Sequence, residues 1–463
     1  MLRLNSVKKH VTDGGNTLTR IRSSKDTIVE ITPLCKKIGV TRVSDITHLD
    51  KLCIPNYSAI LPGTEDSIWV YSGKGITRAD AEASALMEAI ERYSSLSTTY
   101  SMAPIRGTFA ELSKSYNRVL HPEEVIEPVN SIYNDTNSIT DFLPGFDLMS
   151  HEMVLVPAQL ALSRYSAEFP TTDVFPYSHT NGLASGNVLE EAVCHALYEV
   201  IERDATSIAD LCASSIPYNI IERITDSLRT AKNGGYAIER VQAADNFVDD
   251  PTIFPEVDIS EIANEIDPIK KLVNRFIKSG ISLTIKEITQ NDIGIPTFVA
   301  SSIEWITHEY GYFAKGYGTH NDAKVALIRA ITEMSQTRAV NIQGARDDLR
   351  KIQYKENDEI YKRKWPFMAT PPQTTKQIYE NKCKIKFDEI KTYEMDDILD
   401  DINLILNRLK LAGLKKIIII DLTNPNLGIP VVRAIVPGLE TFEVTQTIMG
   451  TRATKYFNER YHH

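Results

Sequence analysis

The segment Ala85-Leu-Met-Glu-Ala-Ile-Glu-Arg92 recurs twice further along the chain. The second copy is Ala196-Leu-Tyr-Glu-Val-Ile-Glu-Arg203, and a weaker third copy is Ala326-Leu-Ile-Arg-Ala-Ile-Thr-Glu333. All three copies have the apolar spacing of a helix. Each follows a glycine-rich segment that we interpret as a turn: Gly73-Lys-Gly75, Gly182-Leu-Ala-Ser-Gly186 and Gly316-Tyr-Gly318. A unit of turn and helix, spread over most of a chain, predicts one architecture that reuses this unit.

Strand-like segments accompany these helices. Ser67-Ile-Trp-Val-Tyr-Ser72 is rich in β-branched and aromatic residues and precedes the first turn, so we expect a strand there. The three helices are predicted over 78–97, up to about residue 211, and up to about residue 340. Near the carboxyl end, residues 416–422 and 430–436 have the composition of two further strands. The sequence therefore predicts an α+β fold with a mixed β-sheet.

The helix starts carry capping signals. Asn187 with Glu190 three residues later has the spacing of a capping box, and Asn321 or Asp322 can cap the third helix.

The length of 463 residues would permit two or three domains. Residues 215–275 and 344–400 fall outside the repeat and are polar or rich in charge and proline. We expect a single catalytic domain over residues 1–463, in which these two stretches are insertions or peripheral subdomains.

Bulk properties exclude several classes of protein. The net charge of −10 argues against general nucleic-acid binding, which needs a basic face. The longest aliphatic run, Ile417–Ile420, is far too short to span a membrane, and the first residues do not resemble a signal peptide. The five cysteines form no CxxC pair, so a disulfide framework or a structural zinc site is not expected. We expect a cytoplasmic protein with no membrane association.

The repeated acids suggest a metal site. Glu88 and Glu91 are three residues apart on a helix and point the same way, as do Glu199 and Glu202. Close carboxylates repel one another, and a divalent cation removes that cost. A surface helix with ordinary Glu–Arg pairs is the structural alternative, but two copies in one register favour a site. Two facing helices could hold two hard cations with four carboxylates.

The arginines suggest a phosphate ligand. Arg329 replaces the first glutamate in the third copy, and a guanidinium binds phosphate oxygens through two parallel hydrogen bonds. Because Mg²⁺ usually shares its shell with water and substrate phosphates, acids and arginines together predict a site for a nucleoside triphosphate. The chain has no GxxxxGK[ST] loop, no kinase motif set and no complete dinucleotide fingerprint. His195 and Cys194 lie close to Glu199 in the sequence, but we do not assign them to the predicted site. We expect a packing role for His195, and we expect Cys194 to be a buried core thiol rather than a sulfur carrier.

Two long blocks resemble the YcaO family. The first is Ser72-Gly-Lys-Gly-Ile-Thr77 followed by residues 82–92, and the second is Asn181-Gly-Leu-Ala-Ser-Gly-Asn187 followed by residues 190–204. With Ile38-Gly-Val-Thr-Arg42 and residues 428–440, the resemblance spans about residues 25–443. It implies the ATP-binding YcaO fold built from repeated turn-helix and mixed β-sheet units, with ATP and Mg²⁺, two ions or more, as cofactors.

The resemblance also implies roles for individual residues. By motif, Glu88, Glu91, Glu199 and Glu202 would bind magnesium. Asn187, Glu191, Arg203 and Arg329 would contact the nucleotide or its metal. A shorter match, Lys-Asp-x-x-x-Glu-x-Thr, adds Lys25 and Thr32 as nucleotide contacts. No residue is assigned as a general base.

In YcaO enzymes a nucleophile adds to a peptide carbonyl, the oxyanion takes the γ-phosphoryl group of ATP, and phosphate leaves. The ending Pro437-Gly-Leu-Glu-Thr-Phe-Glu443 resembles the stand-alone thioamide-forming branch, and a proline-rich PxPxP tail is not present. This branch is similar to the methanogen enzyme that converts a glycine of the methyl-coenzyme M reductase alpha subunit to thioglycine with a sulfide source. It implies a homodimer and, for some members, a TfuA partner.

Two other functions stay open. An azoline-forming cyclodehydratase acting on a ribosomal precursor peptide would use a Cys, Ser or Thr side chain of its substrate as the nucleophile. A non-catalytic scaffold would bind nucleotide and a partner protein without turnover.

Overall fold

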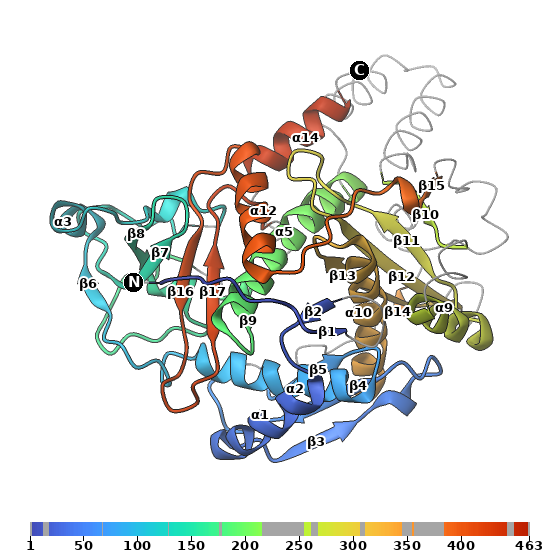
Figure 1. Cartoon of the computed structure of the whole chain (residues 1–463). Coiled ribbons are helices and arrows are strands. Elements are labelled where there is room, and N and C mark those ends of the chain that lie inside the picture. The colour runs from blue at the N-terminus through green and yellow to red at the C-terminus, as the bar shows by residue number, and fades with distance from the viewer. Residues whose placement is uncertain are drawn as a thin grey trace, which may run out of the picture.

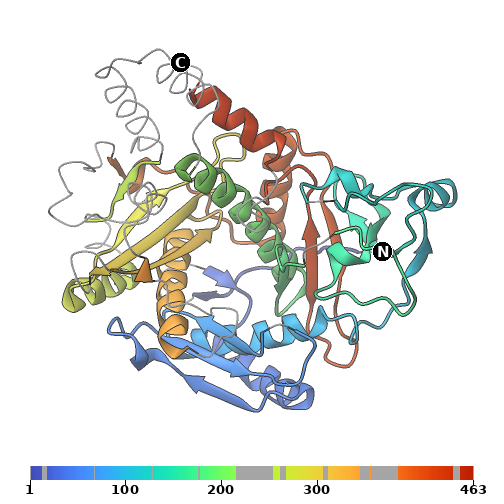
Figure 2. The same cartoon turned by 180° about the vertical axis from the view of Figure 1, so that it is seen from behind.

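The computed structural model describes residues 2–12, 18–66, 68–127, 129–175, 178–214, 254–260, 267–305, 311–344, 354–355, 384–441 and 449–461. Three β-sheets surround a central group of three helices, α2 (Arg78–Ser94), α5 (Leu189–Ser214) and α10 (Ala323–Gln343). Figures 1 and 2 show these helices meeting at the middle of the molecule, with one sheet on each of three sides. These helices are the three predicted copies of the repeat, and the α+β prediction is confirmed.

The first repeat unit belongs to a three-stranded antiparallel sheet with the order β3-β4-β5 (Arg42–Asp45, Asn56–Ile60, Val70–Lys74). Helix α2 packs against β4 and β5, and α1 (Ser24–Ile38) packs against α2. The Thr77 hydroxyl caps α2 by accepting a hydrogen bond from the Asp80 amide, and the Thr77 amide donates one to the Asp80 carboxylate. The buried face of α2 includes Leu86, Ala89 and Ile90, which lie at the spacing of one helical face.

Three of the six glycines of the repeat lie in strands, which corrects their interpretation as turns, whereas Gly182 lies in a turn as expected. Gly73 is in β5, and Gly316 and Gly318 are in β13 (Gly311–Thr319). A Cβ atom on Gly73 would lie 2.1 Å from the Ala81 carbonyl oxygen, and one on Gly318 would lie 2.1 Å from that of Ala326. Both distances are far shorter than a van der Waals contact, so glycine is needed for each helix to lie directly on its strand.

The second repeat unit is anchored by a sheet with the order β6-β7-β16-β17-β9, in which β8 also pairs with β7. Its strands are β6 (Ile105–Gly107), β7 (Thr140–Asp147), β8 (Glu152–Pro157), β9 (Leu183–Ser185), β16 (Ile418–Asp421) and β17 (Val431–Ile435). Helix α5 packs against β9, β17 and α12 (Ile398–Leu411). Leu197 and Ile201 of α5 share a buried core with Ile402 of α12 and Val432 of β17. The short helices α3 (Phe109–Ser115) and α4 (Ala158–Ala161) lie beside this sheet.

The third repeat unit belongs to a sheet with the order β14-β13-β12-β11-β10-β15. Besides β13 it contains β10 (Glu256–Asp258), β11 (Thr284–Glu287), β12 (Thr297–Trp305), β14 (Tyr354–Lys355) and β15 (Lys384–Lys386). Helix α10 packs against β13 and β12, and α9 (Asp267–Ser279) shares the core. Strands β10, β14 and β15 come from the two stretches predicted as insertions, 215–275 and 344–400. Most of both stretches lies outside the described residues, so that assignment stays a prediction.

The two ends of the chain pack near α5. Ser6 and the backbone of Val7 bond to Asp397, and Lys9 forms a buried ion pair of 2.5 Å with Asp401. A short hairpin, β1 (Val11–Thr12) with β2 (Leu18–Arg20), then leads to α1. At the other end, α14 (Thr451–Tyr461) contacts α5.

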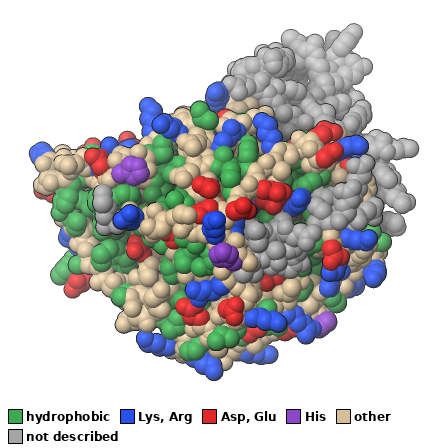
Figure 3. All heavy atoms as spheres, in the orientation of Figure 1, with side chains coloured by type: hydrophobic (Ala, Val, Ile, Leu, Met, Phe, Trp, Pro, Cys, Tyr) green, Lys and Arg blue, Asp and Glu red, His purple; other side chains and the backbone are tan. Residues whose placement is uncertain are grey.

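Two further observations concern the hydropathy of the helices and the charge of the surface. Within the described residues, no helix is both long and apolar enough to cross a membrane. On the face drawn in Figure 3, basic and acidic side chains are intermixed rather than gathered by sign.

Candidate functional site

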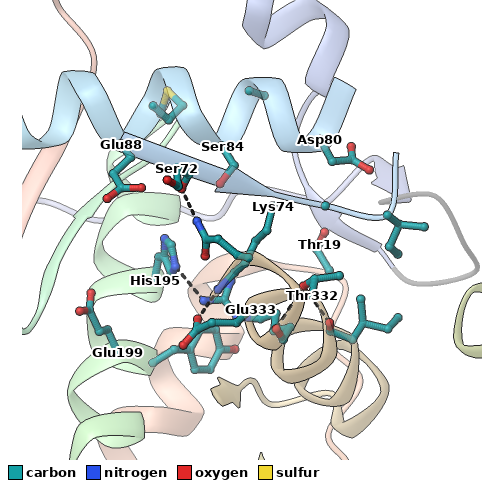
Figure 4. Close-up of a pocket in the computed structure, with 18 of the residues that line it drawn as sticks. Thr19, Ser72, Lys74, Asp80, Ser84, Glu88, His195, Glu199, Thr332 and Glu333 are labelled. Carbon is teal, nitrogen blue, oxygen red and sulfur yellow. Dashed lines mark hydrogen bonds and ion pairs between the residues drawn. The ribbon is translucent and has the colours of Figure 1, made fainter. Parts of the chain in front are cut away.

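A cavity of about 1700 Å³ lies between α2, α5 and α10. Residues of strands β2, β5, β9, β12 and β13, the start of α1 and part of α12 also line it. Figure 4 shows Glu88 of α2, Glu199 of α5 and Glu333 of α10 around the same space. The cavity is therefore the place where the three repeat units meet.

Both predicted pairs of acids line this cavity. Glu88 and Glu91 reach it from α2, and Glu199 and Glu202 reach it from α5. Burial raises the pKa of Glu91 well above its usual value, and the charges of Glu199 and Glu88 raise it further. The acids of the two helices are thus close enough to interact electrostatically.

The acids of α5 also resist ionisation. Burial raises the pKa of Glu199 to about 7, although Arg203 opposes the shift. Burial and the negative charge of Glu333 raise the pKa of Glu202 to about 7. A bound cation would favour the ionised carboxylates and so remove this cost.

These carboxylates are spread around the cavity and do not converge on one position. In the described part of the chain, no three His, Cys, Asp or Glu side chains converge closely enough to hold a metal ion by themselves. Mg²⁺ fits such an arrangement, because it uses one or two carboxylates and completes its shell with water and phosphate oxygens. The donor set therefore suits Mg²⁺ that arrives with a polyphosphate.

The third helix carries the repeat with its charges reversed. Arg329 stands where α2 and α5 have Glu88 and Glu199, and Glu333 stands where α5 has Arg203. Lys74 of β5 forms an ion pair with Glu333 inside the cavity. Burial alone would raise the pKa of Glu333, but the charges of Lys74 and Arg203 outweigh it and lower this pKa. The cavity thus has acids on α2 and α5 and cations that can face a phosphate chain. The cationic residues lining it are Arg20, Arg22, Lys74, Arg203, Lys315 and Arg329.

Four predicted nucleotide contacts line the cavity: Asn187, Glu191, Arg203 and Arg329. The backbone and side-chain amides of Asn187 both donate to the Glu191 carboxylate, at 2.9 and 2.8 Å. Thr27 of α1 donates to the Asn187 side-chain oxygen at 2.8 Å. The predicted capping box of Asn187 with Glu190 is therefore not formed: α5 begins at Leu189, and Asn187 pairs with Glu191. The predicted partner, Glu190, instead accepts a 2.7 Å hydrogen bond from the Asn5 amide.

The other two predicted contacts do not line the cavity. Lys25 is exposed on α1, and the Thr32 hydroxyl donates to the Ile28 carbonyl of the same helix at 2.6 Å. Thr27, two residues along from Lys25 and so on another side of α1, lines the cavity instead. The assignment of Lys25 and Thr32 as nucleotide contacts stays a prediction.

His195 does not have the packing role expected from the sequence. It lines the cavity, and its Nε2 atom lies 2.9 Å from the Arg329 guanidinium. Lys74 and Glu333 were also missed as site residues. The sequence contains a hint of both roles, since Lys74 lies between the two glycines of the first motif and Glu333 is the last residue of the third copy. The other two copies of the repeat have no lysine at the position of Lys74, so comparing the copies did not single it out.

Cys194 is a buried core residue, as the sequence predicted. Burial raises the pKa of its thiol well above the usual range, so the thiolate is strongly disfavoured. A sulfur-carrying nucleophile at this position is chemically unfavourable.

The equivalent arginine of the first copy lies elsewhere. Arg92 forms two hydrogen bonds with Asp66, at 2.8 and 2.7 Å, and it is not among the cavity residues. The two arginines of the repeat therefore differ: Arg92 holds a buried ion pair, and Arg203 faces the cavity.

Fold and cavity together define an α+β protein with a site suited to a phosphate chain and hard cations. The family model "YcaO cyclodehydratase, ATP- and Mg²⁺-binding" matches residues 72–440. The chain belongs to the YcaO family, and the predicted family is confirmed. It is an ATP- and Mg²⁺-dependent peptide-modifying enzyme of that family.

Two relatives are similar to this chain over most of its length. An uncharacterized protein of Methanothermobacter thermautotrophicus is 33% identical over 418 residues, which cover 90% of this chain and 93% of that protein. An uncharacterized protein in the tfuA 3' region of Rhizobium leguminosarum is 29% identical over 442 residues, covering 92% and 90%.

Solved structures show the same fold. YcaO from Methanopyrus kandleri, bound with AMPPCP and Mg²⁺, matches with a TM-score of 0.60 at 20% identity and covers 94% of this chain and 96% of that one. A heterocyclase in complex with substrate and cofactor matches with a TM-score of 0.70 at 22% identity over 95% of this chain. This chain spans 54% of the heterocyclase.

Proposed function

We propose that this enzyme converts a peptide-bond carbonyl to a thioamide, using ATP, Mg²⁺ and external sulfide. The substrate proposed is a glycine of the methyl-coenzyme M reductase alpha subunit. Sulfide adds to the carbonyl carbon, the oxyanion takes the γ-phosphoryl group, and the C–O bond breaks as phosphate leaves. The balance is amide plus hydrogen sulfide plus ATP to thioamide, ADP and phosphate, so no redox partner is needed.

The cavity at the junction of the three repeat units carries this proposal. Phosphoryl transfer to an oxyanion needs charge neutralisation and alignment rather than a protein nucleophile. The acids of α2 and α5 would hold Mg²⁺, which neutralises the triphosphate when bound. Arg203 and Arg329 would bind phosphate oxygens, and Asn187 with Glu191 would position the nucleotide. We keep Lys25 and Thr32 as proposed contacts.

Two observations favour sulfide from outside the protein. Cys194, the cysteine of the cavity wall, is held as a thiol by burial, so it is unsuited to carry sulfur. The similarity to a methanogen protein over most of both chains supports the thioamide-forming branch. The relative in the tfuA 3' region supports a TfuA-type partner. We also propose a homodimer.

Mass spectrometry of the target peptide tests this function directly. Incubation with the enzyme, ATP, Mg²⁺ and sulfide should replace one oxygen by one sulfur at glycine, and omission of sulfide or ATP should prevent it. Loss of one water from a Cys, Ser or Thr peptide without added sulfide would instead support the alternative, azoline formation. The heterocyclase fold match is the observation that keeps this alternative open.

A further inference from the structure

His195 is placed where it can control the arginine of the third repeat unit. It lies on α5, and its Nε2 atom is 2.9 Å from the Arg329 Nη2 atom on α10. At the same repeat position α2 has Ser84 and α10 has Val325, so the imidazole is particular to α5. Figure 4 shows His195 between Glu88 and Glu199 in this view, with its ring directed into the cavity.

The contact fixes the chemical state of the imidazole. A guanidinium has only donors, so Nε2 must accept and the ring proton must sit on Nδ1. Burial and the positive charge of Arg329 lower the pKa of His195 well below its usual range, which agrees with a neutral ring. The contact therefore joins a neutral acceptor to a permanent cation.

A neutral partner is unusual for an arginine in this setting. Arg329 interacts electrostatically with Glu202, and Glu333 lies one turn further along its own helix. Yet within the described residues the hydrogen bond of Arg329 is to His195, and its Nε atom is buried without a partner. A direct ion pair of Arg329 with Glu202 or Glu333 would occupy one edge of the guanidinium, and it would also occupy a carboxylate of the site that is proposed to bind Mg²⁺.

We propose that His195 is a positioning residue that holds the Arg329 guanidinium toward the terminal phosphate of ATP and away from Glu202 and Glu333. The inference rests on the proposed role of Arg329 at the nucleotide. It explains why the unpartnered edge of Arg329 stays available for an oxyanion while the carboxylates stay available for Mg²⁺.

A double-mutant cycle tests this inference. The variants are His195→Phe, His195→Gln, Arg329→Ala and the double variant His195→Phe with Arg329→Ala, and calorimetry measures the affinity for AMPPCP with Mg²⁺. His195→Phe should weaken binding about ten-fold, or about 1.4 kcal/mol, the scale of one hydrogen bond to a charged group. His195→Gln retains an acceptor and should stay within about three-fold of wild type. The double variant should bind no more weakly than Arg329→Ala alone.

The matched control is His48→Phe, which should keep wild-type affinity, because His48 contacts Arg78 at the exposed surface and does not line the cavity. The inference is overturned if the two losses add in the double variant, or if His195→Gln binds as weakly as His195→Phe. It is also overturned if His195→Phe lowers only the melting temperature. Failure of the wild type to bind AMPPCP would reject the nucleotide site itself, and thioamide formation does not enter any of these readouts.

Discussion

Ser185, at the end of β9, donates a hydrogen bond of 3.1 Å to Glu91 of α2. The strand that introduces the second repeat unit thus holds an acid of the first. This contact, with the Lys74–Glu333 pair between the first and third units, joins all three copies of the repeat at one cavity.

The acids should matter for turnover and not for folding. We expect Glu91→Gln and Glu202→Gln each to reduce substrate-dependent phosphate release by about 100-fold or more, since each removes a carboxylate proposed to hold the Mg²⁺ that neutralises the phosphate chain. Their melting temperatures without ligand should stay equal to wild type or rise, because each removes a buried carboxyl that is costly to ionise. Glu389→Gln, at an exposed position, is the matched control. Retained turnover in both site variants would contradict the metal assignment.

Substitution of the two arginines of the repeat should affect different properties, stability for Arg92 and ATP binding for Arg203. Arg92→Ala leaves the carboxylate of Asp66 buried without its bidentate partner, and we expect a loss of about 3 kcal/mol in unfolding free energy. Arg203→Ala should mainly weaken ATP binding, because its side chain lines the cavity. Urea denaturation and nucleotide titration of both variants measure the contrast. Equal stability losses with equal ATP affinities would refute it.

Magnesium binding should depend on pH near neutrality. The raised pKa values of Glu199 and Glu202, about 7, mean that the folded apo-protein keeps protons that the unfolded chain releases above pH 4.5. Apo stability should therefore fall as pH rises from about 4.5 to about 7. Mg²⁺–AMPPCP binding should tighten between pH 6 and 8 and release protons, which calorimetry in buffers of different ionisation enthalpy detects. Binding without proton release at pH 6.5 would argue against these ligands.

Close packing of helix on strand should make Gly318 intolerant of a side chain. Gly318→Ala places a methyl group against the Ala326 carbonyl and the Ala330 amide, so we expect a loss above about 3 kcal/mol or no folded protein. Gly280→Asn is the control, because Gly280 has open space and a left-handed backbone that asparagine tolerates. Thermal unfolding compares the two, and similar melting temperatures would disprove the packing argument.

Sulfide-dependent activity should not need Cys194. Because burial holds its thiol protonated, Cys194→Ala should keep thioamide formation within about two-fold of wild type, apart from a small loss of stability from the removed sulfur. Product formation with free sulfide is the measurement. Complete loss of product in a folded variant would restore the sulfur-carrier hypothesis.

Much of the site could be predicted from local sequence. The ExxER spacing placed two acids on one face of each helix, and the repetition placed them on helices that meet. Gly73, Gly316 and Gly318 were misinterpreted because glycine permits both a turn and a close helix contact, and only the tertiary packing decides between them. The roles of His195 and Lys74 were missed because their partners, Arg329 and Glu333, lie on a distant segment. Sequence spacing holds no information about such contacts.

The order of strands also constrains when this enzyme can become active during its synthesis. Strand β9, which leads into α5, is joined to its sheet through β17, near the carboxyl end of the chain. A nascent polypeptide must therefore leave the ribosome as far as Val431–Ile435 before the cleft can close around its acids. A growing chain would therefore not bind ATP before that point. A chain that terminates before Val431 would be inactive rather than partly active.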